Sequence, residues 1–122
     1  MLLPGPARKI IIHLNEDATA ETGFAYEEVL ALLLKSGVAG ATLTRPEAGF
    51  GSHHRLHEKQ WQGSHNQHLP VRIEFIESQQ TLESLLPALL EIVKDGLIEA
   101  QDTTIIKVAR QENSFYCGIF PK

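Results

Sequence analysis

Histidine side chains can bind metals and exchange protons near neutral pH. Five of the six histidines in this sequence lie between residues 53 and 68. They are His53, His54, His57, His65 and His68. Imidazole is the commonest transition-metal ligand among side chains, and His53 and His57 would share a face if this stretch were helical. One hypothesis is therefore a divalent-metal site formed by His53, His57, His65 and His68.

The same stretch has other interpretations. The spacing of the histidines matches no known metal motif and no cysteine lies among them, so solvated or partner-contacting histidines are the ordinary alternative. Histidines that gained protons together would make the stretch cationic and could act as a pH sensor. Trp61, in the same polar stretch, either clamps onto the body of the protein or anchors a partner together with His53 and His54.

Signals of catalysis, nucleic-acid binding and membrane insertion are weak in this chain. No nucleophile sits in an elbow motif, and a long loop holds catalytic geometry poorly, so we expect no enzyme activity. Basic residues are scattered singly and the net charge is −4, which argues against a nucleic-acid surface. The absence of a signal-peptide pattern and of a long apolar run, with Cys117 as the single cysteine, leads us to expect a cytoplasmic protein.

The 122 residues suit one domain, 1–122, in which strands and helices alternate. Strands are predicted over 8–14, 41–45, 70–77 and 103–109. Helices are predicted over 24–36 and from Ser78 or Thr81 to Gly96, where Pro87 should kink the second helix or restrict it to later residues. This order predicts an α+β, ferredoxin-like (βαββαβ) fold, which is a four-stranded antiparallel sheet with two helices on one face.

Two segments fall outside this pattern. Residues 46–68 form a long loop that we expect to lack regular structure and to carry function. The tail, residues 110–122, is too apolar for a free end, and we expect it to dock. Its large apolar residues are Phe115, Tyr116, Ile119 and Phe120.

The sheet face without helices needs cover. Its side chains are expected to come from Ile11, Ile76, Ile105, His13, Arg72, Glu74 and Lys107. Isoleucines mixed with charges of both signs suit neither a dry core nor a free surface. Such a face fits an interface between subunits, with charges that pair across chains.

Three motifs along the chain resemble the PII signal-transduction superfamily. They are Gly37-Val38-Ala39-Gly40-Ala41-Thr42-Leu43-Thr44, then Gly49-Phe50-Gly51, then Leu69-Pro70-Val71-Arg72-Ile73-Glu74. In that superfamily the second strand leads through Gly-Phe-Gly into a long T-loop, which returns by Leu-Pro. The chain resembles still more an uncharacterised PII-like branch that shares Gly-Ala-Thr and Gly-Phe-Gly-Ser-His. The resemblance covers about residues 8–109 and implies a PII-like homotrimer with ligand clefts between subunits.

The candidate ligand-cleft residues are Gly49, Phe50, Gly51, Ser52, Arg45 and Thr42. Gly49-Phe50-Gly51 either lets a ligand approach closely or only turns the chain away from the sheet. PII proteins hold nucleotide phosphates with a Gly-Asp-Gly-Lys turn before the last strand, where this chain is expected to place Glu99-Ala100-Gln101-Asp102. Ser52 stands where PII proteins have an arginine, so ATP binding in the PII manner is not expected.

Two functions are compatible with these observations. In the first, a small ligand in the cleft orders or releases the loop, which then binds a target protein. The resemblance suggests a membrane transporter or channel as that target, and we expect neither nucleic-acid binding nor direct insertion into a membrane. In the second, the chain is a trimeric metal-binding protein that uses the loop histidines, since divalent-cation-tolerance proteins are also ferredoxin-like trimers.

Overall fold

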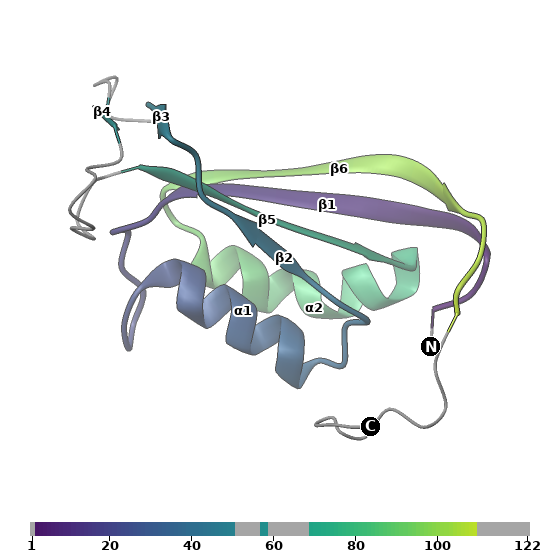
Figure 1. The fold of residues 1–122 in the computed structure, drawn as a ribbon. Helices are drawn as coiled ribbons and strands as arrows, with labels where there is room; N and C mark the ends of the chain where they lie inside the picture. The colour runs from purple at the N-terminus through teal and green to yellow at the C-terminus, as the bar shows by residue number, and fades with distance from the viewer. Residues whose placement is uncertain (1, 51–56, 59–68, 110–122) are drawn as a thin grey trace, which may run out of the picture.

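The computed structural model describes residues 2–50, 57–58 and 69–109 (Figure 1). Its elements, in chain order, are β1 (Gly5–Asn15), α1 (Ala25–Lys35), β2 (Thr42–Thr44), β3 (Ala48–Gly49), β4 (His57–Glu58), β5 (Pro70–Glu77), α2 (Gln79–Ile92) and β6 (Gly96–Ile105). Four strands form an antiparallel sheet in the order β2-β5-β1-β6, and both helices cover one face of it (Figure 1). The prediction of a four-stranded antiparallel α+β fold is confirmed.

The hydrophobic core lies between the sheet and the two helices. Side chains of a strand alternate between its faces, so every second residue of β1 and β5 points toward the helices. The helices contribute residues three or four positions apart, which lie on one helical face. The buried core residues of these four elements are Ile10, Ile12, Leu14, Ala25, Val29, Leu33, Val71, Ile73, Phe75, Leu82, Leu85 and Leu89.

The helix ends follow local chemistry. Gly37 has φ of 78°, a conformation that glycine adopts without strain, and it follows the last turn of α1. The Ser78 side chain accepts a hydrogen bond of 3.1 Å from the Thr81 N–H and so caps α2. Pro87 does not restrict α2, which continues through it on its exposed side. None of the helices in the part of the chain described here has the length and apolar character needed to cross a membrane.

The last strand begins earlier than predicted. The sequence predicted a strand over 103–109, but β6 pairs with β1 from Gly96, opposite Leu14, to Ile105, opposite Gly5. Gly96 therefore opens a strand, and α2 already ends at Ile92. The error arose because an edge strand tolerates polar residues that hide the apolar alternation. Lys107, expected within this strand, lies beyond it.

The loop between β2 and β5 contains a short paired segment. Ala48 pairs with Glu58 and Gly49 pairs with His57 in an antiparallel ladder of β3 and β4. The expectation that residues 46–68 lack regular structure is therefore wrong for these four positions. These two short strands, β3 and β4, lie beyond the end of the main sheet (Figure 1).

Candidate functional site

A hollow of about 370 Å³ lies where β1 ends, beside the loop and the turn that precedes β6. We call it the loop-end cleft. Its lining residues are His13, Leu14, Asn15, Phe50, Pro70, Asp95, Gly96 and Leu97. The antiparallel register explains why they meet, since Asn15 is opposite Pro70 and Leu14 is opposite Gly96. The cleft therefore joins four segments that are far apart in the sequence.

The walls of the loop-end cleft offer two kinds of surface. Phe50 is 62% exposed and Leu97 is 57% exposed, so large apolar side chains are open to solvent there. Asn15 is buried and Asp95 is exposed, and both are polar. Exposed apolar groups beside a few polar ones are typical of small-ligand sites.

The turn from Val93 to Gly96 positions one side of this cleft. A side chain on Gly96 would overlap the backbone carbonyl oxygen of His13, so the two strands approach closely only because this residue is glycine. On the helix side, a second hollow of about 280 Å³ shares Leu14, Asn15 and Asp95 with the cleft. Lys94, within the turn, lines that second hollow and supplies a cation there.

The turn before the last strand lies earlier in the chain than expected, which changes the residues that could meet a nucleotide phosphate. Glu99-Ala100-Gln101-Asp102 does not form a turn, because all four residues lie within β6 and pair with β1. The turn before the last strand contains Asp95-Gly96, which keeps the Asp-Gly of the PII pattern. Leu97 follows where that pattern has lysine, so the ammonium group is absent from this position.

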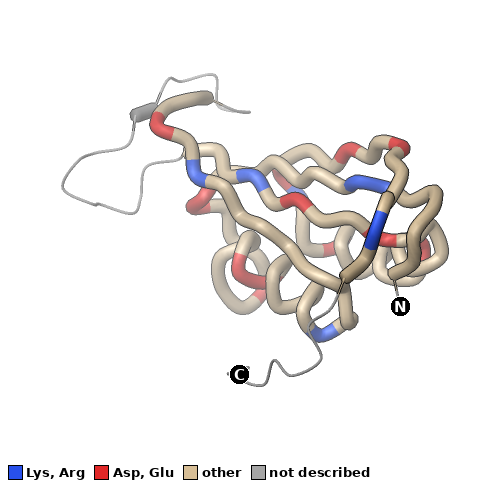
Figure 2. Tube along the Cα trace, turned by 45° about the vertical axis from the view of Figure 1, so that its right-hand side comes forward, with Lys and Arg blue, Asp and Glu red and all other residues tan. Residues whose placement is uncertain are grey.

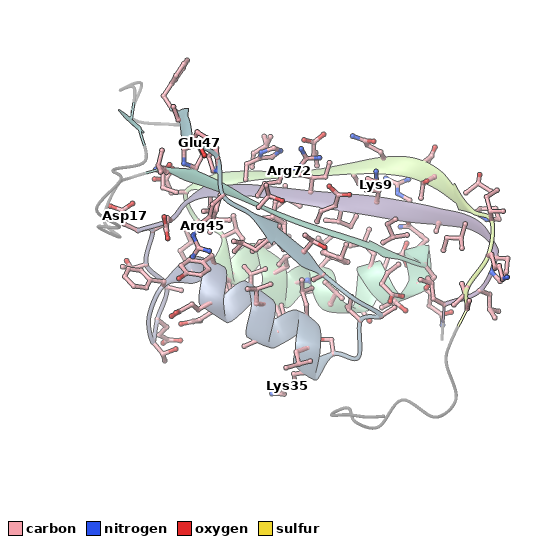
Figure 3. The ribbon with its side chains drawn as sticks, viewed as in Figure 1. Lys9, Asp17, Lys35, Arg45, Glu47 and Arg72 are labelled. Atoms are coloured by element: carbon pink, nitrogen blue, oxygen red, sulfur yellow. The ribbon has the colours of Figure 1, made fainter. Side chains whose placement is uncertain are left out.

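Glu16 connects both ends of the loop to β1. Its carboxylate accepts a hydrogen bond of 2.9 Å from Arg45 Nε, just after β2, and its backbone N–H donates one of 2.7 Å to the carbonyl of Leu69, just before β5. The Arg45 guanidinium also lies 5.4 Å from the ring centre of Tyr26 on α1. The hydrogen bond with Glu16 raises the pKa of Arg45. We call Glu16, Tyr26, Arg45 and Leu69 the loop root; Figure 3 labels Arg45 there.

On the helix-free face of the sheet, charges pair within the chain. Lys9 lies 3.6 Å and Arg72 lies 3.0 Å from Glu74, and His13 Nε2 lies 2.8 Å from Glu99 Oε2. Lys9 and Arg72 project from the side of the sheet away from the helices (Figure 3), and charges of both signs are interspersed along the strands (Figure 2). Ile11, between them, is only 4% exposed. These charges thus have partners within the chain, and the expected pairing of charges across chains stays a prediction.

Of the predicted cleft residues, the structure brings Phe50 to the loop-end cleft. Gly49 lies beside it in β3, close to the Pro70 ring. Thr42 lies on β2 opposite Glu74, and Arg45 lies in the loop root, so neither lines this cleft. Gly51 and Ser52 lie outside the described residues.

The predicted metal and partner residues fall mostly outside the described part of the chain. His57 lies in β4. The residues outside the described part are His53, His54, Trp61, His65 and His68. Within the described residues, no group of three or more histidine, cysteine, aspartate or glutamate side chains could hold a metal ion. The metal hypothesis stays a prediction.

Asn15, Pro70, Asp95 and Leu97 line the cleft but were not predicted to do so. The signal for Asp95 and Leu97 was present as an Asp-Gly pair directly after a helical pattern. It was missed because Gly96 was interpreted as the end of the helix. Asn15 carries no such signal, because a polar residue after a strand is ordinary for a loop.

Comparison with known proteins places these features in context. The family model DUF190, described as uncharacterized, matches residues 7–105. The UPF0166 protein of Methanocaldococcus jannaschii is 29% identical over 102 residues, which cover 83% of this chain and 93% of that protein.

Three solved structures are similar in fold. CPII of Thiomonas intermedia K12, bound to ADP, AMP and bicarbonate, has a TM-score of 0.58 at 19% identity and covers 85% of this chain and 97% of its own. A PII-like signaling protein of Thermus thermophilus has a TM-score of 0.59 at 14% identity, with 84% and 91% covered. Arabidopsis thaliana PII bound to citrate has a TM-score of 0.51 at 14% identity, with 86% and 94% covered. These likenesses show a PII-like fold.

The close approach at Gly96 gives a first prediction. Gly96→Ala should lower the free energy of unfolding by about 1–3 kcal/mol, because the added methyl group overlaps the His13 carbonyl and must separate β1 from β6. Gly40→Ala is the matched control, since a methyl group there meets no atom within 4 Å, and its effect should stay within about 0.5 kcal/mol. Urea denaturation measures both, and equal stability of the two variants would contradict the assigned geometry.

The pairing of His13 with Glu99 gives a second prediction. The hydrogen bond from His13 lowers the pKa of Glu99 below its ordinary value of 4.5. A carboxyl group whose pKa is lower in the folded state stabilises the fold above its unfolded pKa, and this contribution is lost as the pH falls through the folded pKa. Wild-type protein should therefore lose more stability between pH 6 and pH 3 than Glu99→Gln does.

The control for this experiment is Glu91→Gln, which removes an exposed carboxylate from α2 and should keep the wild-type loss. Denaturant midpoints measured at each pH provide the comparison. If Glu99→Gln and wild type lose stability in parallel, His13 and Glu99 do not interact in solution.

Proposed function

The chain belongs to the uncharacterised DUF190 family, and we propose that it is a PII-like regulatory protein whose loop responds to a small ligand in the loop-end cleft. The observation that carries this proposal is the position of Phe50, which lines the cleft and also follows β3 in the loop. A ligand that contacts Phe50 contacts the loop directly. Because loop states differ in their contacts with such a ligand, binding would shift their populations.

The end of β1 offers a second connection between ligand and loop. Asn15 lines the cleft, and the next residue, Glu16, bonds to both ends of the loop. A ligand that moves Asn15 would alter the Glu16 contacts with Arg45 and Leu69. The loop root would then carry the change to residues 46–68.

The chemistry of the cleft favours a ligand with a flat ring and few phosphates. Phe50, Leu97 and Pro70 present apolar surface suited to the faces of a base, while Asn15 and Asp95 can hydrogen-bond to its edge. The basic side chains that line the two hollows are Lys94, in the turn, and His13, which pairs with Glu99. This limited positive charge suits one or two phosphates better than three. CPII, which shares the fold, is bound to ADP and AMP, so adenine nucleotides are the first class to test.

A homotrimer is the assembly that we propose, following the resemblance to PII proteins. Phe50 and Leu97 leave apolar surface exposed at the mouth of the cleft, and a neighbouring copy that covered it would enclose the ligand. Exposed apolar groups beside a cleft favour such burial. The loop, with Trp61, His53 and His54, would then bind a target protein, for which a membrane transporter or channel is our hypothesis.

Calorimetric titration with AMP, ADP, ATP and bicarbonate tests the ligand proposal. AMP or ADP should bind with higher affinity than ATP, and Phe50→Ala should weaken that binding about tenfold, which corresponds to about 1.4 kcal/mol. Leu90→Ala is the control, because Leu90 is a large apolar residue that is 56% exposed on α2 and does not line the cleft. It should bind the nucleotide as wild type does.

Light scattering on the same samples should give the mass of three 13.6 kDa chains for all three proteins. Absence of nucleotide binding by a trimeric wild type would reject adenine nucleotides as the ligand. Equal binding by Phe50→Ala and wild type would instead place the ligand elsewhere. A monomer mass would contradict the trimer.

A further inference from the structure

The outer edge of β6 is a long strand edge that no other described strand covers, and its charged residues are Glu99 and Asp102. Among the described residues β6 pairs only with β1, so the backbone groups along its other edge have no strand partner. Proteins usually protect such edges with lysine, proline or short strands. β2, at the opposite edge of the sheet, has 3 residues, whereas β6 has 10 and contains neither lysine nor proline.

Exposed apolar side chains lie at one end of this edge. Ile106 is 85% exposed, and Val108 and Leu3 are also exposed. Gly5 pairs with Ile105, so Leu3, Ile106 and Val108 lie at the end of the sheet farthest from the loop, where β1 begins and β6 ends (Figure 1). We call these three residues the far-end patch. It is independent of the loop-end cleft and of the proposed function.

We propose that the chain's own C-terminal segment, residues 115–120, covers the far-end patch and pairs as an added strand with the outer edge of β6. The described chain stops at Ala109, three residues after Ile106, and 13 residues follow. Residues 110–114 are polar and can form a turn, while residues 115–120 are Phe-Tyr-Cys-Gly-Ile-Phe. Aromatic and β-branched residues are the ones that strands favour.

Chain length also favours this occupant over a second copy of the protein. The connecting residues, 110–114, span at most about 18 Å when fully extended. Residues 115–120 therefore stay close to Ile106 and Val108. A turn through 109–114 returns the chain antiparallel to β6, which is the usual connection between neighbouring antiparallel strands. The segment is thus held at high effective concentration beside the patch, which a separate copy is not.

Cys117 provides a direct probe, because it is the only cysteine and lies in the middle of the segment. In the full chain its reaction with a disulfide reagent such as DTNB should be at least tenfold slower than in a synthetic peptide of residues 110–122. Ile106→Ser should restore most of the peptide's rate, because it removes apolar contact without disturbing the core. Leu34→Ser, on the exposed face of α1, is the matched control and should keep the wild-type rate.

Three results would overturn the proposal. Cys117 that reacts as fast in the full chain as in the peptide would show that the segment is not docked. Protection that Ile106→Ser leaves unchanged would place the segment elsewhere. Protection that grows with protein concentration would assign the patch to a neighbouring copy and would also contradict docking within the chain. Circular dichroism of Ile106→Ser verifies that the variant is folded.

Discussion

The alternation of β1 is the constraint on which the other features depend. Ile10, Ile12 and Leu14 must face the helices, so Ile11 and His13 face the opposite side of the sheet. The strand is hydrogen-bonded to β5 along one edge and to β6 along the other. A shift of β1 by one residue relative to either neighbour would move its buried side chains from the helix-covered face to the other face of the sheet. The register therefore fixes which residues meet where β1 ends, and with them the loop-end cleft.

The helix-free face is stabilised differently from the core. Its ion pairs are partly exposed, and each such pair contributes at most about 1 kcal/mol. These side chains flank Ile11, since Glu74 and Glu99 are opposite it on β5 and β6 and Lys9 and His13 lie two positions away on β1. Ile11 is only 4% exposed. Because the charged side chains of this face are already paired within the chain, their neutralisation does not require opposite charges from another subunit. An assembly through PII-like contacts would then depend on apolar groups at its rim, such as Leu97 and Phe50.

The sequence predicted most of the fold because the buried strands and helices have strong periodic patterns. β5 was predicted with the observed bounds, 70–77, and both helices within a few residues. The prediction failed at β6, where an edge position permits Glu99, Gln101 and Asp102 in a strand. That single error moved the turn by several residues and removed Asp95 and Leu97 from the candidate site. Burial of Asn15 and the bonds of Glu16 to Arg45 and Leu69 depend on tertiary contacts, which local patterns do not encode.

The central claim is that occupancy of the loop-end cleft is coupled to the loop. Hydrogen exchange measured by mass spectrometry, with and without saturating ADP, tests it most directly because it reports on cleft and loop in one experiment. The account predicts slower exchange with ADP both in the peptide covering residues 93–97 and in the peptide covering residues 46–50. Slower exchange at residues 93–97 with residues 46–50 unchanged would show that ADP binds without affecting the loop and would contradict the account.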